Sequence, residues 1–366
     1  MRHICIDARL FGINHTGIGR YVENLIKYLP SENGTKVTLI ISPENENSPV
    51  LEKYSKVVAK YHPYAIPSQF EMLYIWWKTR PDLLHATHSS IPALWPGKIV
   101  VTFHDLIRHI SRGKETTTQK YFLYWIKYLG YLAVDVIAIY RSVKIIVPSN
   151  FWKEIIIKKF RISETKIIVT YEGVDSNILQ AKIGKPVYVS DLPYVVYTGT
   201  IYPHKNIPIL LEAIKLLKGK YKLVLVGARS VFTERTQDLI KKYSISDSVT
   251  LLEKLSDDQL VSLYSRALVF VFPSLIEGFG LPGLEAMSVG LPVIAANASC
   301  LPEIYQDSVL YFDPNSSDEL SKQIEKIDKD KNLRKILVKK GLNQAKKYSW
   351  DKMAKQTWQI YQNALH

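Results

Sequence analysis

Residues 267–296 constrain the fold of this 366-residue chain more than any other stretch. Two continuous apolar runs, residues 268–272 and the run that ends at Ala296, flank a glycine-rich turn and a segment of helical character. Strands that are apolar on both faces are typical of parallel sheets covered by helices on both sides. We predict a helix over residues 282–289, because proline suits the first helical turn and Gly290 suits a left-handed end. The pattern therefore predicts a doubly wound α/β domain.

The turn of this motif offers a site for a phosphate group. The first amides of a helix have no intrahelical partner, and the backbone of Gly278, Phe279 and Gly280 adds further amides beside them. Glu277 precedes the turn and Glu285 lies inside the predicted helix, so both carboxylates can face one ligand. The plain alternative is that any doubly wound domain has such a turn and that Glu277 is a solvated loop residue.

The longer string around the turn is more specific. Pro-Ser, Glu-Gly-Phe-Gly-Leu-Pro, Glu-Ala-Met and Gly-Leu-Pro-Val-Ile-Ala, in this order, resemble the donor-nucleotide motif of the retaining glycosyltransferases of family four. The resemblance implies that Glu277 lies against the transferred sugar and that Glu285 binds the ribose hydroxyls. It also implies that the backbone of residues 278–280 follows the donor diphosphate, with Leu281 in the same donor site.

A second glycine motif lies near the start of the chain. Gly17 and Gly19 fall in a predicted loop between an opening strand, residues 4–8, and an apolar-periodic helix. Two glycines alone more often mark a tight turn that lets a helix pack closely. The surrounding Thr-Gly-Ile-Gly-Arg-Tyr is similar to the N-terminal loop of the same family. That resemblance implies a loop that approaches the donor diphosphate from the opposite domain.

Two histidines follow predicted strands, where the ligands of open α/β sheets gather. Residues 99–106 contain a buried strand that ends in His104 and Asp105, so this carboxylate could orient the imidazole. A structural histidine that caps a strand is the alternative. Val-Val-Thr-Phe-His-Asp-Leu is also similar to a phrase of the family, which implies that His104 contacts the donor sugar. His88 follows another predicted strand end, and we expect His88 and Asp105 on the acceptor side.

Lys205 stands where a positive charge is unfavourable. It directly precedes a predicted helix, and a lysine at a helix N-terminus opposes the helix dipole, so we expect an anion beside it. The resemblance implies that Lys205 grips the donor diphosphate and that Gly199, at the end of the preceding predicted strand, belongs to the same donor site. The family often has arginine where Thr200 or His204 stands. We expect His204 or Arg229 to replace this missing charge.

The cysteine count and the net charge indicate the cellular compartment and the kind of partner that we expect. The length predicts two domains, and Cys5 and Cys300 are too few for a disulfide framework, which suits a reducing cytosol. No export signal is visible. Lys and Arg number 48 against 34 Asp and Glu, a net charge of +14 that calls for an anionic partner. Residues 108–161 hold eleven basic and three acidic residues, so +8 of the excess lies in one segment.

Two aromatic segments are predicted to be helical. Residues 116–140 have apolar runs far shorter than a membrane span, and the aromatics interleaved with lysines favour an interfacial helix on anionic lipid. A long crossover helix with its aromatic face in the core is the plainer alternative. For residues 70–77 we favour a place in the core over an acceptor-side surface, because large aromatic side chains are usually buried.

The resemblance runs from residue 4 to the final helix, with its motifs in the family's order. It implies the glycosyltransferase B (GT-B) architecture, an α/β fold of two doubly wound Rossmann-like domains facing across a cleft. We place the N-terminal acceptor-side domain at residues 1–185 and the nucleotide-sugar domain at residues 186–347. Residues 348–366 are expected to form a terminal helix that crosses back to the first domain.

The predicted function follows from the same resemblance. We expect a retaining hexosyltransferase, mannose slightly favoured, that uses a GDP- or UDP-sugar donor and a glycan or lipid-linked acceptor in cell-surface polysaccharide or glycolipid synthesis. No metal and no further cofactor are expected, because helix amides and Lys205 can neutralise the leaving diphosphate. The expected location is cytoplasmic and peripheral on the inner face of the membrane.

The competing functions are a GT-B-fold sugar-nucleotide epimerase or phosphorylase and a non-enzymatic nucleic-acid-binding protein. Nucleic acid is not expected as a partner, because the basic residues accompany apolar aromatic helices and no recognised nucleic-acid motif. The donor sugar, its nucleotide, the acceptor, the linkage and the oligomeric state are not determined by the sequence.

Overall fold

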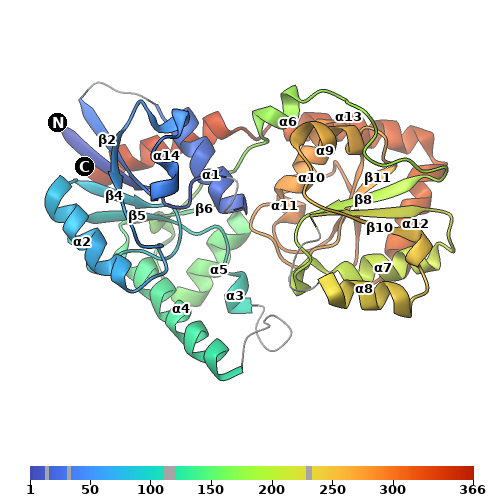
Figure 1. Ribbon diagram of the computed structural model, residues 1–366, viewed down its shortest axis with the longest axis horizontal. Helices are drawn as coiled ribbons and strands as arrows, with labels where there is room; N and C mark the ends of the chain where they lie inside the picture. The colour runs from blue at the N-terminus through green and yellow to red at the C-terminus, as the bar shows by residue number, and fades with distance from the viewer. Residues whose placement is uncertain (13–15, 31–33, 111–120, 228–232) are drawn as a thin grey trace. The chain divides into compact units, whose positions relative to one another are not determined.

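The computed structural model describes residues 1–12, 16–30, 34–110, 121–227 and 233–366. These residues form two compact units (Figure 1). The first contains Met1–His109, residues 121–172 and Trp350–His366, and the second contains Gly173–Ser349. Each unit is a parallel sheet with helices on both faces, which confirms the predicted α/β class and its two doubly wound domains.

The second unit begins earlier than the boundary expected between residues 185 and 186. Helix α6 (Ser176–Gln180) packs on helices α9 (Asp257–Tyr264) and α10 (Leu281–Ser288) of the second unit. Asp175 caps α6 by accepting a hydrogen bond from the amide of Asn177 at 3.0 Å. The segment that contains α6, which was expected to end the first domain, therefore belongs to the packed body of the second unit.

In the described residues, the sheet of the first unit has seven parallel strands in the order β3-β2-β1-β4-β5-β6-β7. The strands are β1 (Arg2–Asp7), β2 (Thr35–Ile41), β3 (Ser55–Val58), β4 (Leu83–Ala86), β5 (Lys98–Thr102), β6 (Lys144–Val147) and β7 (Ile167–Val169). The central strands are buried on both faces, as their continuous apolar runs predict. The register aligns Asp7 with Ala86 and Ala86 with Val101, so the segments that follow β1, β4 and β5 leave the sheet side by side.

The helices of the first unit cover its two faces in separate layers. The helices are α1 (Thr16–Tyr28), α2 (Pro67–Thr79), α3 (Ile107–Ile110), α4 (Tyr121–Arg141), α5 (Asn150–Phe160) and the terminal α14 (Trp350–Leu365). Helix α14 packs on α1, β4 and β5 (Figure 1). Connections β3 to β4 and β5 to β6 cross the sheet in the direction opposite to β1 to β2. Right-handed crossovers therefore place α2 and α4 on the face opposite α1.

The sheet of the second unit has six parallel strands among its described residues, in the order β10-β9-β8-β11-β12-β13. The strands are β8 (Tyr194–Thr198), β9 (Lys222–Val226), β10 (Val249–Leu252), β11 (Val269–Phe272), β12 (Val293–Ala296) and β13 (Leu310–Phe312). Besides α6, α9 and α10, the helices are α7 (Ile207–Leu216), α8 (Thr233–Lys242), α11 (Leu301–Tyr305), α12 (Ser317–Lys329) and α13 (Lys331–Ala345). The stretch that dominates the sequence becomes β11, α10 and β12, in the predicted order.

The structure bears on the expectations for the two aromatic segments. Throughout the described ranges, no helix is long and apolar enough to cross a membrane. The core placement predicted for residues 70–77 is wrong for Phe70, Tyr74 and Trp77, which are exposed on α2. Helix α2 has apolar side chains on both faces, and only the face with Met72 and Ile75 is buried.

Candidate functional site

A tyrosine side chain packs against the glycine turn before α10. Gly280 is the N-cap residue of α10, and its φ of 98° is a left-handed conformation that favours glycine. The buried Tyr305 hydroxyl donates a hydrogen bond to the Gly280 carbonyl at 2.5 Å. A Cβ on Gly280 would lie 2.7 Å from that hydroxyl oxygen, closer than packing allows. Gly290 has a φ of 79°, which confirms the predicted left-handed stop.

Glu277 is fixed from three sides. Its amide donates to Ser299 Oγ at 3.1 Å, and Cys300 Sγ donates to its carbonyl at 3.3 Å. Its carboxylate accepts a hydrogen bond from Lys205 Nζ at 2.6 Å, and the two side chains are only 9% and 17% exposed. The structure therefore brings together two predicted donor-site residues from separate segments of the second unit. A charge-assisted pair this close and this sheltered is among the stronger polar contacts that a protein makes.

The local backbone explains why Lys205 needs an anion. Lys205 ends a short 3₁₀ turn, Pro203–Lys205, and α7 begins at Ile207. The side chain of Asn206, which precedes α7, makes no capping hydrogen bond to the helix, and its amide donates to the carbonyl of Pro314 at 2.8 Å. Lys205 thus stands two residues before a helix, where a positive charge opposes the helix dipole, and the Glu277 carboxylate supplies a negative charge beside its ammonium.

Of the two residues expected to replace the missing arginine, the structure describes His204. Burial and, to a smaller extent, the nearby Lys205 lower the pKa of His204 to about 4, while Glu277 opposes the shift. This shift disfavours a positive charge on His204, and its replacement of the missing arginine stays a prediction. Arg229, the other expected replacement, lies outside the described residues.

Gly199 directly follows β8, in a backbone conformation that favours glycine. Its φ is 139°, and a Cβ there would lie 3.1 Å from the hydroxyl oxygen of Tyr197. Its amide donates to the carbonyl of Val226 on the neighbouring strand at 3.0 Å. Gly199 thus keeps the segment between β8 and Lys205 close to the sheet, while its predicted contact with a donor stays a prediction.

The remaining donor-site residues lie along the start of α10. Leu281 is the first residue of the helix, and Glu285 lies one turn further on with 4% of its surface exposed. Phe279 is buried, with its ring edge-on to Tyr348 at 5.4 Å between centroids. The amides at the start of α10 have no intrahelical partners, as a phosphate site requires. That Glu285, Gly278 and Leu281 contact a nucleotide stays a prediction.

In the first unit, His104 makes one hydrogen bond to a backbone carbonyl and lies beside one carboxylate. His104 Nε2 donates to the carbonyl of Thr87 at 3.0 Å, and its Nδ1 lies 3.5 Å from Glu172 Oε1. Asp105, which was expected to orient this ring, accepts a hydrogen bond from the amide of Ile107 at 2.9 Å. That expectation is corrected, because Asp105 caps the start of α3 and the carboxylate beside the imidazole comes from Glu172.

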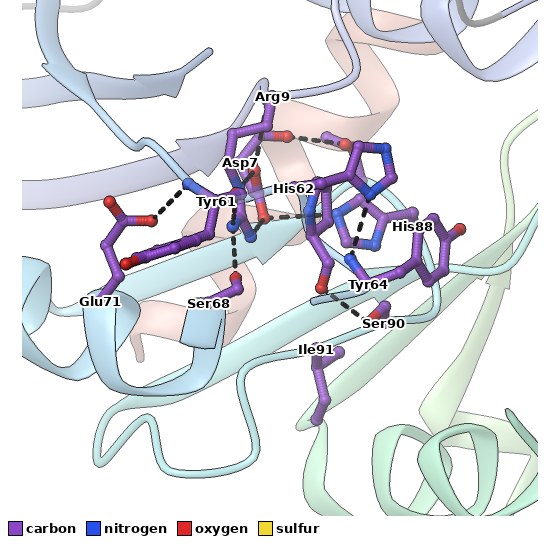
Figure 2. A network of polar contacts seen from close by, with 12 residues as sticks. Asp7, Arg9, Tyr61, His62, Tyr64, Ser68, Glu71, His88, Ser90 and Ile91 are labelled. Carbon is purple, nitrogen blue, oxygen red and sulfur yellow. Dashed lines mark hydrogen bonds and ion pairs between the residues drawn. The ribbon is translucent and has the colours of Figure 1, made fainter. Parts of the chain in front are cut away.

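His88 belongs to a buried charged cluster at the ends of β1 and β4 (Figure 2). Arg9 forms a two-pronged pair with Asp7, with Nε to Oδ1 at 2.8 Å and Nη2 to Oδ2 at 2.6 Å. His88 Nε2 lies 3.3 Å from Asp7 Oδ2, within ion-pair range but outside hydrogen-bond geometry. Burial alone raises the pKa of Asp7, but Arg9 and His88 outweigh burial and hold that pKa well below its usual range.

His88 is covered by an aromatic segment. Only 1% of its surface is exposed, and Tyr64 lies over it with ring centroids 5.6 Å apart. His62 stacks on Tyr64 at 5.4 Å, and the Ser90 hydroxyl donates to the Pro63 carbonyl (Figure 2). His88 Nδ1 is buried and finds no hydrogen-bond partner among the described residues. The acceptor-side role predicted for His88 and Asp105 stays a prediction.

The glycines of the N-terminal motif lie inside a helix and not in the loop before it. Helix α1 begins at Thr16, so Gly17 and Gly19 fall in its first turn. Gly17 is exposed, and a Cβ there would meet no atom within 4 Å. The expected loop is corrected, although amides of a first helical turn still have no intrahelical partner and can face an anion. Their contact with a diphosphate stays a prediction.

Sequence reasoning missed the residues that support the site. Tyr305, Ser299 and Cys300 hold the Glu277 turn, and Glu172 and Thr87 hold His104. Thr87 and Glu172 each follow the end of a strand, where the ligands of α/β sheets gather, and that was the available signal for them. The residues that the structure describes include no group of three or more His, Cys, Asp or Glu that could hold a metal ion.

Comparison with known proteins finds related sequences and solved structures of similar fold. The chain is 34% identical over 227 residues to O-antigen chain mannosyltransferase B of Escherichia coli, covering 59% of this chain and 60% of that protein. It is 28% identical over 247 residues to O-antigen chain mannosyltransferase RfbU of Salmonella typhimurium, covering 67% and 65%. The chain thus spans less than two thirds of the length of each relative. The crystal structure of Anabaena Alr3699/HepE in complex with UDP-glucose superposes with a TM-score of 0.75 at 17% identity, covering 99% of this chain and 100% of that one.

Two family models match consecutive parts of the chain. The model described as Glycosyltransferase Family 4 matches residues 15–178, and the model described as Glycosyl transferases group 1 matches residues 180–344. The first match lies mainly in the first unit, and the second lies in the second unit. The chain therefore belongs to the glycosyltransferase family that these two models describe.

Proposed function

We propose that this protein is a retaining, metal-independent hexosyltransferase that moves mannose from a GDP- or UDP-sugar to a hydroxyl of a glycan or lipid-linked acceptor. The observation that carries the proposal is the sheltered Lys205–Glu277 pair beside the amides at the start of α10. The names of the relatives, both O-antigen chain mannosyltransferases, support mannose and a polysaccharide product. The bound UDP-glucose of the Anabaena protein supports a nucleotide-sugar donor.

The Lys205–Glu277 pair suggests how binding of the donor prepares the site for sugar transfer. A diphosphate at the start of α10 competes with Glu277 for the Lys205 ammonium, because both are anions within reach of one cation. When Lys205 turns to a phosphate oxygen, the Glu277 carboxylate is released toward the sugar. Lys205 and the helix amides then stabilise the leaving diphosphate, as a divalent ion does in other transferases.

Retention follows from front-face attack. The bond between the anomeric carbon and the phosphate oxygen breaks while the acceptor oxygen forms its bond on the same face of the sugar. The acceptor proton passes to the departing phosphate oxygen, so the atoms balance without a base from the protein. Glu277 stabilises the positive charge that develops on the sugar ring. Exclusion of water limits donor hydrolysis in such a step.

The proposed location is the cytoplasmic face of a membrane, where a lipid-linked acceptor is reached from water. The net charge of +8 over residues 108–161 supports an anionic surface as a partner. The family match and the transferase relatives do not favour the epimerase, phosphorylase or nucleic-acid-binding alternatives.

The test uses purified full-length protein with GDP-mannose and UDP-glucose, each with and without a glycan or lipid-linked acceptor. We expect product only when the acceptor is present, an unchanged anomeric configuration by NMR, and full activity in excess chelator. Donor consumption to an epimer without acceptor would contradict transfer. An inverted product would contradict retention, and rescue of chelated enzyme by magnesium or manganese would contradict metal independence.

A further inference from the structure

Helix α2 presents a row of large apolar side chains to solvent. Phe70, Tyr74 and Trp77 are 65%, 59% and 63% exposed, Ile66 just before the helix is 80% exposed, and Leu73 lies between them. These positions are three or four residues apart, so they share one side of the helix. A contiguous exposed apolar patch of this kind is uncommon on a protein surface unless something binds there. We name this row the α2 stripe.

Helix α4 carries a second row of exposed apolar side chains along one of its sides. Its exposed apolar side chains are Leu129, Val136, Ile137 and Tyr140, and we name them the α4 stripe. The opposite side of α4 is buried through Tyr128, Asp135, Ala138 and Ile139. Both helices therefore use one apolar side for the core and leave another unpaired within the first unit.

The two stripes belong to one layer. Both helices cover the face of the sheet opposite α1 and α14 (Figure 1). Residues 91–97 link them: Gln69 of α2 accepts a hydrogen bond from the amide of Ala93, and Arg141 at the end of α4 donates to the carbonyl of Trp95. Leu94 of this link is itself 47% exposed. The apolar surface thus continues from one helix toward the other.

Exposed cations lie at the end of α2 and on α3. Lys78 and Arg80 are exposed at the end of α2, and Arg108 is exposed on α3. The carboxylates on the described parts of the two helices are turned away: Glu71 accepts hydrogen bonds from the amides of Lys60 and Tyr61, and Asp135 is buried against His109 at 2.8 Å. The surface therefore joins exposed aromatics to a basic rim without an outward acid among these residues.

We propose that the α2 and α4 stripes are the surface by which the first unit docks on an anionic lipid bilayer. Tryptophan and tyrosine favour the membrane interface, where the ring is apolar and its polar atom stays hydrated, while lysine and arginine pair with anionic headgroups. The proposal deepens the proposed function, on which it rests for the lipid-linked acceptor, by naming the docking residues. It differs from docking by charge alone because apolar insertion supplies part of the affinity.

A second copy of the chain is a poorer occupant than a bilayer. A twofold dimer places the same patch on both partners, so Lys78, Arg80 and Arg108 would face a rim of equal charge. An anionic bilayer neutralises that rim and accepts the aromatic side chains in the same step.

The test is sedimentation of the full-length protein with vesicles of phosphatidylcholine alone or of phosphatidylcholine with phosphatidylglycerol. We expect the wild type to bind the anionic vesicles and to keep part of this binding at high salt. Phe70→Ser with Trp77→Ser should lower the partition coefficient by about tenfold or more, because two interfacial aromatics are lost. The control, Leu216→Ser with Ile336→Ser, removes two apolar side chains of similar exposure from the second unit and should not change binding.

The same variants are assayed for sugar transfer to a water-soluble acceptor, which keeps the two proposals separate. Normal transfer with lost vesicle binding supports the docking surface, whereas normal transfer by a wild type that ignores anionic vesicles overturns it. Vesicle binding without transfer would overturn the proposed function and leave the surface standing. Unchanged binding by the Phe70 and Trp77 variant, or a shift from dimer to monomer in sedimentation velocity, would also overturn the proposal.

Discussion

Replacing Lys205 and Glu277 one at a time should change nucleotide affinity in opposite directions. In the structure the ammonium of Lys205 is 2.6 Å from the Glu277 carboxylate, and a nucleoside diphosphate must break this pair to engage the lysine. Lys205→Met removes the cation and keeps the apolar stem. Glu277→Gln removes the competing charge and keeps the size of the side chain.

The expected changes in Kd follow from the low solvent exposure of Lys205 and Glu277. A charge-assisted contact to phosphate contributes about 1.5 to 3 kcal/mol, so Lys205→Met should raise the Kd of GDP or UDP by about 10-fold to 150-fold. Exposed ion pairs contribute about 0.2 to 1 kcal/mol, and side chains 9% and 17% exposed should reach at least the upper value. Glu277→Gln should therefore lower that Kd by about fivefold. Its turnover should nevertheless fall, because the carboxylate no longer stabilises charge on the sugar.

Isothermal titration with GDP and UDP measures both affinities, and initial rates with the full donor measure turnover. The matched control is Lys340→Met, which breaks a 2.7 Å pair with Asp307 on the surface of the same unit and should leave the Kd unchanged. Weaker nucleotide binding by both variants would refute the competition between Glu277 and the diphosphate. Unchanged binding by Lys205→Met would remove this lysine from the site altogether.

Three further perturbations address other parts of the molecule. Glu285→Ala should chiefly raise the donor KM in initial-rate assays, and a wild-type KM would remove Glu285 from ribose binding. Glu172→Gln should lower kcat more than Asp105→Asn, because Glu172 faces His104, and equal effects would contradict this assignment. Burial lowers the pKa of His85 to about 3, so only the unfolded chain takes up a proton as pH falls below 6.5. His85→Gln should therefore flatten the loss of unfolding free energy between pH 6 and 4 by up to about 1.4 kcal/mol per pH unit in urea titrations, whereas an unchanged slope would exclude His85.

The donor-side geometry was largely predictable because it is local. Glu277, the glycine turn, α10 and the left-handed Gly290 follow one another within a short stretch, and each choice of residue has a backbone reason. The anion expected beside Lys205 also followed from a local rule, since a cation at a helix N-terminus is unfavourable. Its identity as Glu277 did not, because the two residues come from different β-α units of the sheet.

The histidine sites show where local reasoning failed. Asp105 adjoins His104 in the chain, yet its carboxylate accepts a hydrogen bond from the amide of Ile107. The carboxylate beside the imidazole belongs to Glu172, which is distant in the sequence. The cluster of Asp7, Arg9 and His88 forms only because β1 and β4 are neighbours in the sheet (Figure 2). A side chain can pair with any suitable group that lies near it in space. The order of the strands in the sheet determines which groups are near.

The sequence by itself determined the parallel α/β class, the order of the motifs and the conformation of the glycine turn. These depend on the apolar runs of the strands and on backbone preferences, which act over a few residues. The tertiary structure decided where the second unit begins, which carboxylate meets which base, and which face of α2 is left in solvent. A helix with two apolar faces satisfies the same sequence pattern whichever face packs, and only the sheet beneath it selects the face that is buried.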